Sequence, residues 1–366
     1  MSRTPHGLII GKFHPPHRGH ELLFRSAARN SVRLTVLVLG KPSEAIPVES
    51  RVAWIREMLV DVGNCSVAGG TDVHPINYDS PAIWDLHEQE FRRVLAAVTN
   101  EPVTAVFSSE DYGAELARRF GATNVALDEP RTLVPVSSTF VRENPVDRWE
   151  DLPLAVRAGL CKRVVLLGAE STGTTTTSRD LVDVLRSRGG AHGLTRWVPE
   201  CGRDVTISKL ADASAFAQLQ GQTPPTMGDL QWPTGEFVTI ARSQNRIEDE
   251  EARIGGPVLV CDTDAFATGI WHERYRRCSS SAVEALARKH SLYLLTQHGG
   301  VPFEQDGIRD GESHREWMTE RFEQALTETN RRYVSLNGTR TQRLTTALSA
   351  IDKLLFEGWE FGVSDQ

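Results

Sequence analysis

The sequence has no long apolar run, few cysteines and no excess of basic residues. No segment is apolar over enough residues to span a bilayer, and the first residues, MSRTPH, lack the apolar core of a signal peptide. The five cysteines form no C-x-x-C pair, which argues against a structural zinc site, and their odd number suits reduced thiols. A net charge of −7 argues against general nucleic-acid binding, which needs a basic surface. We therefore expect a cytoplasmic protein that has neither a membrane nor nucleic acid as a partner.

The chain is long enough, at 366 residues, for two domains that each have their own core. We expect strands at residues 8–10, 34–39, 103–107, 164–167, 258–261 and 292–295, and helices at 21–29, 49–61, 85–98 and 113–120. This alternation predicts an α/β protein with two doubly wound parallel-sheet domains. A segment rich in proline, tryptophan and charge separates them, so we place a first domain at 1–145, a linker at 146–162 and a second domain at 163–366.

The stretch GKFHPPHRGH at residues 11–20 joins the first expected strand to the first expected helix. Free backbone amides and the positive end of a helix dipole favour an anion at such a turn. His17 and His20 can donate hydrogen bonds to phosphate oxygens there, and Gly19 lets a ligand approach the backbone. A polar loop with two chance histidines is the alternative interpretation. The whole string closely resembles the H-x-G-H signature of the nucleotidyltransferase superfamily.

A second polar motif, VPVSSTFVR, ends the first domain. Ser137, Ser138 and Thr139 open an expected helix, and Arg142 follows about one turn later. Hydroxyls, helix-start amides and a guanidinium on one side make a phosphate cradle. Taken alone, this string is equally compatible with an ordinary helix cap. Beside the first motif, it matches the S-S-T-x-x-R signature of the same superfamily.

The second domain opens with the frame of a P-loop, in which a strand, the pattern G-x-x-x-x-G and a helix follow one another. The candidate phosphate-binding residues are Gly168, Glu170, Ser171, Thr172, Gly173, Thr174, Thr175 and Thr176. Thr174 stands where a P-loop has lysine, so the cation that reaches the β- and γ-phosphates is missing. Thr175 keeps the hydroxyl that holds Mg²⁺. Other glycine-rich turns would give a similar string, which leaves nucleotide binding as one of two interpretations.

Three further groups of charged residues follow expected strands or loops. They are Asp262 with Asp264, Glu200 with Arg203, and Asp306 with Arg309. Asp262 ends a strand like the Walker B carboxylate that holds Mg²⁺, and Asp264 can accept a hydroxyl proton from a substrate. The third group lies in a polar, glycine-containing loop that can close over phosphates. Solvent-facing carboxylates and surface ion pairs are the alternatives for these groups.

In this order the motifs resemble the NadR family, whose members fuse a nicotinamide mononucleotide (NMN) adenylyltransferase to a ribosylnicotinamide kinase. The resemblance covers about residues 7–350 and rests on residues 11–20, 51–55, 137–142, 168–173, 197–204, 262–264 and 306–309. It implies an H-x-G-H nucleotidyltransferase domain with a Rossmann-like fold, followed by a P-loop kinase-like domain. Some members begin with a DNA-binding helix-turn-helix. We expect none here, because the residues before Leu8 leave no room for one.

The resemblance also implies site residues in the first domain. ATP would be bound by Gly11, Phe13, His17, Gly19, His20, Ser137, Ser138, Thr139 and Arg142, and NMN by Arg51, Asn77 and Trp84. Trp84 is equally compatible with a place in the core. His17, His20, Lys12 and Arg142 would stabilise charge while the NMN phosphate attacks ATP directly, without a covalent enzyme intermediate.

For the second domain, the resemblance implies phosphorylation of nicotinamide riboside by ATP. Thr175 and Asp262 would hold Mg²⁺, Glu200, Arg203 and Asp264 would contact the riboside, and Asp306 and Arg309 would form a lid. ATP is then a substrate of both domains, Mg²⁺ is the cofactor, and NMN and nicotinamide riboside are the other small-molecule partners.

Two alternatives to this bifunctional interpretation stay open. Without the lysine, the second domain can be a silent module that senses nucleotide and regulates the first. The first domain can also act on another phosphate acceptor, because cytidylyl and pantetheine-phosphate transferases share the H-x-G-H frame. A homo-oligomer is compatible with the sequence, which does not decide the oligomeric state.

Overall fold

The computed structural model describes residues 3–77, 79–359 and 361. The outer ends of the two predicted domains, residues 1–2 and 362–366, lie outside this range. The chain divides into two compact units, Met1–Gly159 with Trp359–Gln366 and Leu160–Gly358. The confirmed part of the fold prediction is that each unit contains one parallel sheet with helices on both faces.

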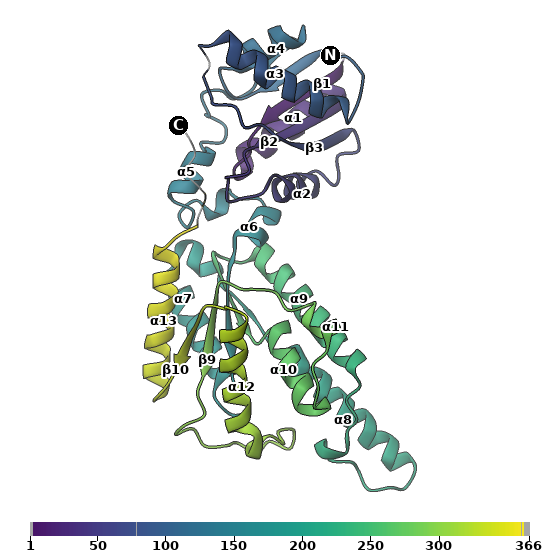
Figure 1. Cartoon of the computed structure of the whole chain (residues 1–366), viewed down its shortest axis with the longest axis vertical. Coiled ribbons are helices and arrows are strands. Elements are labelled where there is room, and N and C mark those ends of the chain that lie inside the picture. Colours follow the sequence, from purple (N-terminus) through teal and green to yellow (C-terminus); the bar gives the residue numbers. More distant parts are fainter. Residues whose placement is uncertain (1–2, 78, 360, 362–366) are drawn as a thin grey trace. The chain divides into compact units, whose positions relative to one another are not determined.

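The first unit contains a five-stranded parallel sheet with the strand order β3-β2-β1-β4-β5 (Figure 1). Its elements are β1 (Thr4–Gly11), α1 (Arg18–Asn30), β2 (Ser31–Gly40), α2 (Val48–Met58), β3 (Cys65–Thr71), α3 (Pro81–Ala96), β4 (Ala105–Ser108), α4 (Gly113–Phe120), β5 (Thr123–Ala126), α5 (Ser138–Glu143), the 3-10 helix η1 (Trp149–Asp151) and α6 (Leu154–Leu160).

The central strands of the first unit are apolar because both of their faces are covered. Leu8 and Ile10 pack against Phe91 and other apolar side chains of α3 and α4, and Ile9 is equally buried on the opposite face. The chain builds β2 and β3 on one side of β1 and then β4 and β5 on the other. The strand order therefore reverses at the carboxyl ends of β1 and β4, which is where ligands bind in open α/β sheets.

The second unit contains a five-stranded parallel sheet with the strand order β10-β9-β6-β8-β7. Its elements are β6 (Lys162–Leu167), α7 (Thr174–Ser187), η2 (Gly190–Leu194), β7 (Arg196–Val198), α8 (Cys201–Leu219), η3 (Met227–Asp229), α9 (Thr234–Ile254), β8 (Val258–Asp262), α10 (Ala265–Arg276), α11 (Ser281–Glu284), β9 (Leu292–Thr296), η4 (Glu312–His314), α12 (Arg315–Glu328), β10 (Tyr333–Leu336) and α13 (Arg340–Phe356).

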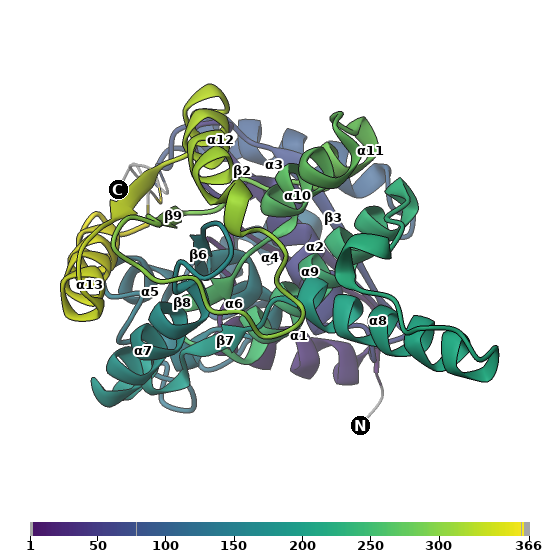
Figure 2. The ribbon, with the colours of Figure 1, turned by 90° about the horizontal axis from the view of Figure 1, so that it is seen from below.

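Helices cover both faces of the second sheet. Helices α7 and α13 pack on one face, where Leu181, Leu185 and Ile351 contact Val164 and Val260. Helices α9, α10 and α12 lie on the opposite side, and α8 extends away from the sheet (Figure 2). The carboxyl ends of β6, β7 and β8 are neighbours, so the segments that follow these three strands converge.

The predicted linker, residues 146–162, is divided between the units. Its first part forms η1 and α6 in the first unit, and β6 begins at Lys162. Trp149 is fully buried and packs 6.0 Å from Trp359, ring centroid to centroid, so residues close to the end of the chain complete the first unit. All five cysteines are free thiols. Among the described residues, no helix combines the length and the apolar character needed to cross a membrane.

We predict that Trp149→Ala destabilises the first unit by about 3–5 kcal/mol, the usual cost of emptying a buried tryptophan site. Hydrogen exchange followed by mass spectrometry should show faster exchange in peptides of β1 and β2 and unchanged exchange in β6 and β8. Trp317→Ala, which truncates a side chain that is 39% exposed, is the matched control. Equal effects of the two variants would contradict this account of Trp149.

Candidate active sites

The H-x-G-H segment lies at the point where the strand order of the first sheet reverses. It leaves β1 at Gly11 and enters α1 at Arg18. Phe13 adopts a left-handed backbone conformation with φ of 49°, and its ring lies edge-on to His20 with the centroids 4.9 Å apart. The turn therefore holds the ring of His20 at the start of α1, beside the backbone amides that no helical carbonyl can reach.

His17 and His20 cap α1 reciprocally. The backbone amide of His20 donates to Nδ1 of His17 at 3.4 Å, and the amide of His17 donates to Nδ1 of His20 at 3.3 Å. The two rings stack with centroids 3.7 Å apart. Because both Nδ1 atoms accept, the ring proton of each neutral imidazole is on Nε2. Each ring is thus left with one N–H donor for a ligand.

The environment keeps both imidazoles neutral. Burial, helped by the positive charge of Arg131, lowers the pKa of His17 to about 3. Burial, together with His17 and Arg131, also holds the pKa of His20 well below its usual value. These groups can therefore donate hydrogen bonds to phosphate oxygens at neutral pH, but they add no positive charge.

The S-S-T-x-x-R motif is fastened to the H-x-G-H loop. The hydroxyl of Ser138 donates to the carbonyl of Pro15 at 3.1 Å, and Nη1 of Arg142 donates to the carbonyl of His14 at 2.7 Å. Nη2 of Arg142 also bonds the hydroxyl of Thr139 at 3.2 Å. The structure thus brings the two predicted motifs together, and it engages the guanidinium of Arg142 with the loop.

One cavity unites most of the predicted ATP-binding residues. Its lining includes His17, Gly19, His20, Ser137, Ser138, Thr139, Arg131, Asp128 and Glu110. Arg131 was not predicted. It has a φ of 52°, pairs with Glu110 at 2.6 Å, and sits in a loop whose amides at Leu133 and Val134 donate to Asp128. No pattern marks this arginine in the sequence, because only the folded loop turns it toward the histidines.

A second cavity adjoins Lys12 on the other side of the H-x-G-H segment. Gly11, Lys12, Asn77 and Trp84 line it, so the predicted NMN residues Asn77 and Trp84 lie together. Trp84 is only 5% exposed and also belongs to the core beneath α3, so its place in the core is confirmed and its contact with NMN stays a prediction.

Arg51, which was also expected to contact NMN, is instead fully buried. Its Nη1 donates to the carbonyl of Lys12 and its Nη2 to the carboxylate of Glu44, both at 2.7 Å. Glu44 in turn pairs with Nζ of Lys12 at 3.3 Å. Arg51 therefore positions Lys12 and has no surface left for a ligand.

His87 and Asp72 form a pair in the same cavity that the sequence analysis missed. Nδ1 of His87 lies 2.5 Å from the carboxylate of Asp72, and Nε2 lies 3.1 Å from the carbonyl of Pro75. The hydrogen bond to Asp72 raises the pKa of His87. The two residues are 15 positions apart, on the loop after β3 and on α3, and no sequence signal joined them.

The P-loop of the second unit has the backbone that a phosphate cradle requires. Gly173, with φ of 87°, precedes the first residue of α7, and Ser171 has φ of 56°. The hydroxyl of buried Thr172 donates to the carbonyl of Ala169 at 2.7 Å, and Nη1 of Arg343 donates to the carbonyl of Thr172 at 2.6 Å. These bonds hold the loop through its carbonyl groups, and its amides at the start of α7 stay available to an anion.

Asp262 lies at the end of β8, beside the P-loop. Its side chain is 2% exposed. Burial raises the pKa of Asp262, and hydrogen bonds from the hydroxyls of Thr175 and Thr174 oppose that rise. The hydroxyl of Thr175 and the carboxylate of Asp262, which bond each other, are oxygen ligands of the kind that Mg²⁺ prefers. The residues present therefore fit the expected ion. Within the described part of the chain, no cluster of three histidine, cysteine or acidic side chains could hold a metal by itself.

Most of the other predicted kinase residues line one cavity, and Thr172, Gly173, Asp264 and Asp306 do not. Its lining includes Glu170, Ser171, Thr174, Thr175, Thr176, Glu200, Arg203, Asp262, Arg309 and Arg179. Burial and the negative charge of Asp262 raise the pKa of Glu200 to about 7. Arg203 bonds the carboxylate of Asp306, and Nη1 of Arg309 donates to the carbonyl of Glu304 at 2.9 Å. The arginine of α8 thus tethers the polar loop that was predicted as a lid.

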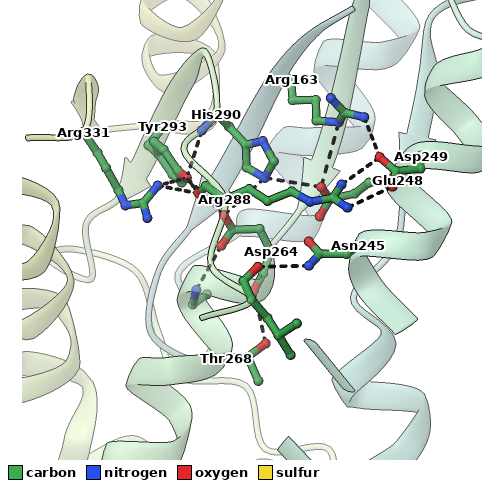
Figure 3. A network of polar contacts seen from close by, with 12 residues as sticks. Arg163, Asn245, Glu248, Asp249, Asp264, Thr268, Arg288, His290, Tyr293 and Arg331 are labelled. Carbon is green, nitrogen blue, oxygen red and sulfur yellow. Dashed lines mark hydrogen bonds and ion pairs between the residues drawn. The ribbon is translucent and has the colours of Figure 1, made fainter. Parts of the chain in front are cut away.

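Asp264 does not line the cavity, because it is fully buried. Its carboxylate caps α10 by accepting from the amide of Ala267 at 2.9 Å, and it accepts from the hydroxyl of Tyr293 at 3.2 Å. Figure 3 shows it in a network in which His290 lies 3.6 Å from Asp264 and 3.3 Å from Glu248. We therefore correct its expected role from substrate contact to support of the turn that carries Asp262.

We predict that His17 and His20 stay neutral, with the proton on Nε2, from pH 7.5 down to pH 5. Nitrogen-15 spectra of histidine-labelled protein should show no titration of these two rings in that range. His87 is an internal contrast, because its hydrogen bond to Asp72 raises its pKa and favours its protonated form. Titration of His17 near pH 6.5 would contradict the burial argument.

The chain is similar to known proteins in both sequence and structure. The family described as AAA domain matches residues 163–343. The chain is 23% identical over 320 residues to the trifunctional NAD biosynthesis/regulator protein NadR of Escherichia coli (strain K12), covering 83% of this chain and 71% of that protein. It matches the crystal structure of NadR in complex with NR at a TM-score of 0.67 and 20% identity, over 96% of each chain. The NadR structure with NAD and AMP-PNP matches at a TM-score of 0.67 and 20% identity, over 100% of this chain and 99% of that one. The chain therefore has the fold of NadR, and its similarity is to proteins of NAD biosynthesis.

Proposed function

We propose that the first unit transfers an adenylyl group from ATP to NMN, giving NAD and pyrophosphate. The observation that carries this proposal is the joined pair of motifs, in which Ser138 and Arg142 bond the H-x-G-H loop and the two histidines present neutral N–H donors. Relatives of similar sequence and fold are named for NAD biosynthesis, and one NadR structure holds NAD with AMP-PNP.

In this reaction an oxygen of the NMN phosphate attacks the α-phosphorus of ATP, and the bond to the β-phosphate breaks. ATP lies in the cavity of His17 and His20, and NMN lies in the cavity of Asn77 and Trp84. Lys12, which lines the second cavity, faces the joining phosphates. The N–H groups of the histidines, the amides of α1 and the charges of Lys12 and Arg131 stabilise the charge that grows on the transferred and leaving phosphates. The protein needs no nucleophile of its own.

For the second unit we propose phosphorylation of nicotinamide riboside by ATP. Its support is the P-loop backbone together with Glu200, whose pKa near 7 suits a general base. Glu200 takes the proton of the riboside 5′-hydroxyl as that oxygen attacks the γ-phosphorus, and ADP leaves. Thr175 and Asp262 would hold Mg²⁺, which neutralises phosphate charge when bound. Arg203 and Arg309 hold the polar loop over the site.

A silent, nucleotide-sensing second unit is the other candidate, and the threonine at position 174 is the observation that favours it. Such a module would keep the amides that bind ATP and lack the charge that speeds transfer. The two candidates differ in one product, which is NMN made from the riboside.

We predict that the full chain forms both NMN and NAD when it is incubated with Mg-ATP and nicotinamide riboside. Chromatography of the reaction mixture measures the two products. His17→Ala/His20→Ala should lower NAD formation by about 10²–10³-fold, the usual cost of lost transition-state donors, and NMN should then accumulate. NAD formed from added NMN but not from riboside would refute the kinase and support the sensing module. No NAD from added NMN would refute the adenylyl transfer.

We predict that the rate of riboside phosphorylation rises with pH through about 7, because Glu200 must be unprotonated to accept the proton. Glu200→Gln should lower kcat by about 10²–10⁴-fold and abolish this rise. Adenylyl transfer to NMN, measured on the same samples, should not change. A glutamine variant that kept the pH dependence would exclude Glu200 as the base.

A further inference from the structure

The proposed kinase lacks a cation at the place where P-loops supply one. Thr174 occupies that position, and its hydroxyl bonds the carboxylate of Asp262. A transferred phosphoryl group carries negative charge on three oxygens, and its stabilisation in P-loop enzymes includes a lysine. An active site without this lysine needs another positive group that reaches the same phosphates.

Arg179 is placed to do so by the geometry of α7. It follows Thr175 by four residues, so the two side chains lie on the same face of the helix. Side chains on a helix tilt toward its N-terminus, which points Arg179 back toward Thr175 and the P-loop. Arg179 lines the same cavity as Thr174, Thr175 and Asp262.

Trp197 holds this guanidinium in place. The central carbon of the Arg179 guanidinium lies 4.6 Å above the Trp197 ring, a distance that suits a cation–π contact. The indole itself is oriented, because its Nε1 donates to the hydroxyl of Ser178 at 2.9 Å. Stacking on an aromatic face leaves the N–H groups at the edge of the guanidinium available to an anion.

The other two arginines of the cavity are already engaged with the polar loop. Arg203 bonds Asp306, and Arg309 bonds the carbonyl of Glu304 and pairs with Asp306 at 3.6 Å. Among the residues that the structure describes, no carboxylate lies within ion-pair distance of Arg179, which contacts the Trp197 ring and attracts the carboxylate of Asp262 from farther away. Arg179 is therefore the guanidinium of this cavity that a phosphate can recruit without breaking an ion pair.

We propose that Arg179 is a catalytic residue of the second unit that contacts the transferred phosphate in place of the missing P-loop lysine. This inference rests on the proposed kinase function. It assigns the positive charge to the second turn of α7, from which a long side chain reaches the site that a lysine would reach from the first turn.

The test compares five variants of the full chain for riboside phosphorylation with Mg-ATP. Arg179→Ala should lower kcat by at least about 100-fold, the typical cost of one lost transition-state donor, and Arg179→Lys should lower it less. Thr174→Lys in the Arg179→Ala background should bring kcat back to within about tenfold of the unmodified chain, because the lysine then supplies the charge. Arg242→Ala, on the exposed side of α9, is the matched control, and Thr174→Lys alone completes the set. Adenylyl transfer to NMN reports that the first unit of each variant is folded, and thermal unfolding followed by circular dichroism reports the fold of the second unit.

The same variants in a His17→Ala/His20→Ala background are titrated with Mg-AMP-PNP, so that binding is read at the second unit. We expect Arg179→Ala to weaken binding by about tenfold. If the unmodified chain phosphorylates no riboside, the kinase proposal fails, and this titration alone decides the role of Arg179. The inference is overturned if Arg179→Ala lowers kcat less than tenfold, or if its affinity for Mg-AMP-PNP equals that of the control.

Discussion

Both candidate sites depend on one constraint, which is that the chain must pass from the carboxyl end of a buried central strand into a helix. The first amides of that helix have no carbonyl partners, so they are either capped or offered to an anion. In the first unit, His17 and His20 cap α1 and extend its donors outward through their rings. In the second unit, Gly173 precedes α7 and supplies no side-chain cap, so the donors remain on the backbone. The unpaired amides at a helix start are thus used in two ways within one chain.

The sequence predicts the elements whose burial leaves a pattern. Strands β1, β2, β6, β8 and β9 are covered on both faces, and each was expected from its apolar run. Strands β3, β5 and β10 were missed, because they are edge strands whose residues are partly exposed. The sequence of β3, CSVAGGT, carries two glycines and no clear alternation, so it contains no strand signal strong enough to read.

The candidate sites could be predicted only where their residues are neighbours in sequence. The H-x-G-H and P-loop residues follow from local turns, and they line cavities as expected. The charge of Arg51 and Asp264 suggests exposed positions, yet each residue is buried and bonds partners from distant segments. Arg131 reaches its cavity through a loop shape that Asp128 holds, which no spacing rule reports. Burial and long-range contact, rather than residue type, decide these cases.

The electrostatics of the two cavities differ in a way that follows from their partners. In the first unit, burial keeps the histidines neutral, so the positive charge comes from Arg131 in their cavity and from Lys12 in the other cavity. The cavity of the second unit holds Glu200 and Asp262, and burial, with the negative charge of Asp262 as a smaller cause, raises the pKa of Glu200 to about 7. A lysine at position 174 would pair with these carboxylates as readily as with a phosphate. A threonine there bonds Asp262 without neutralising it, so the carboxylate of Asp262 keeps its attraction for a cation.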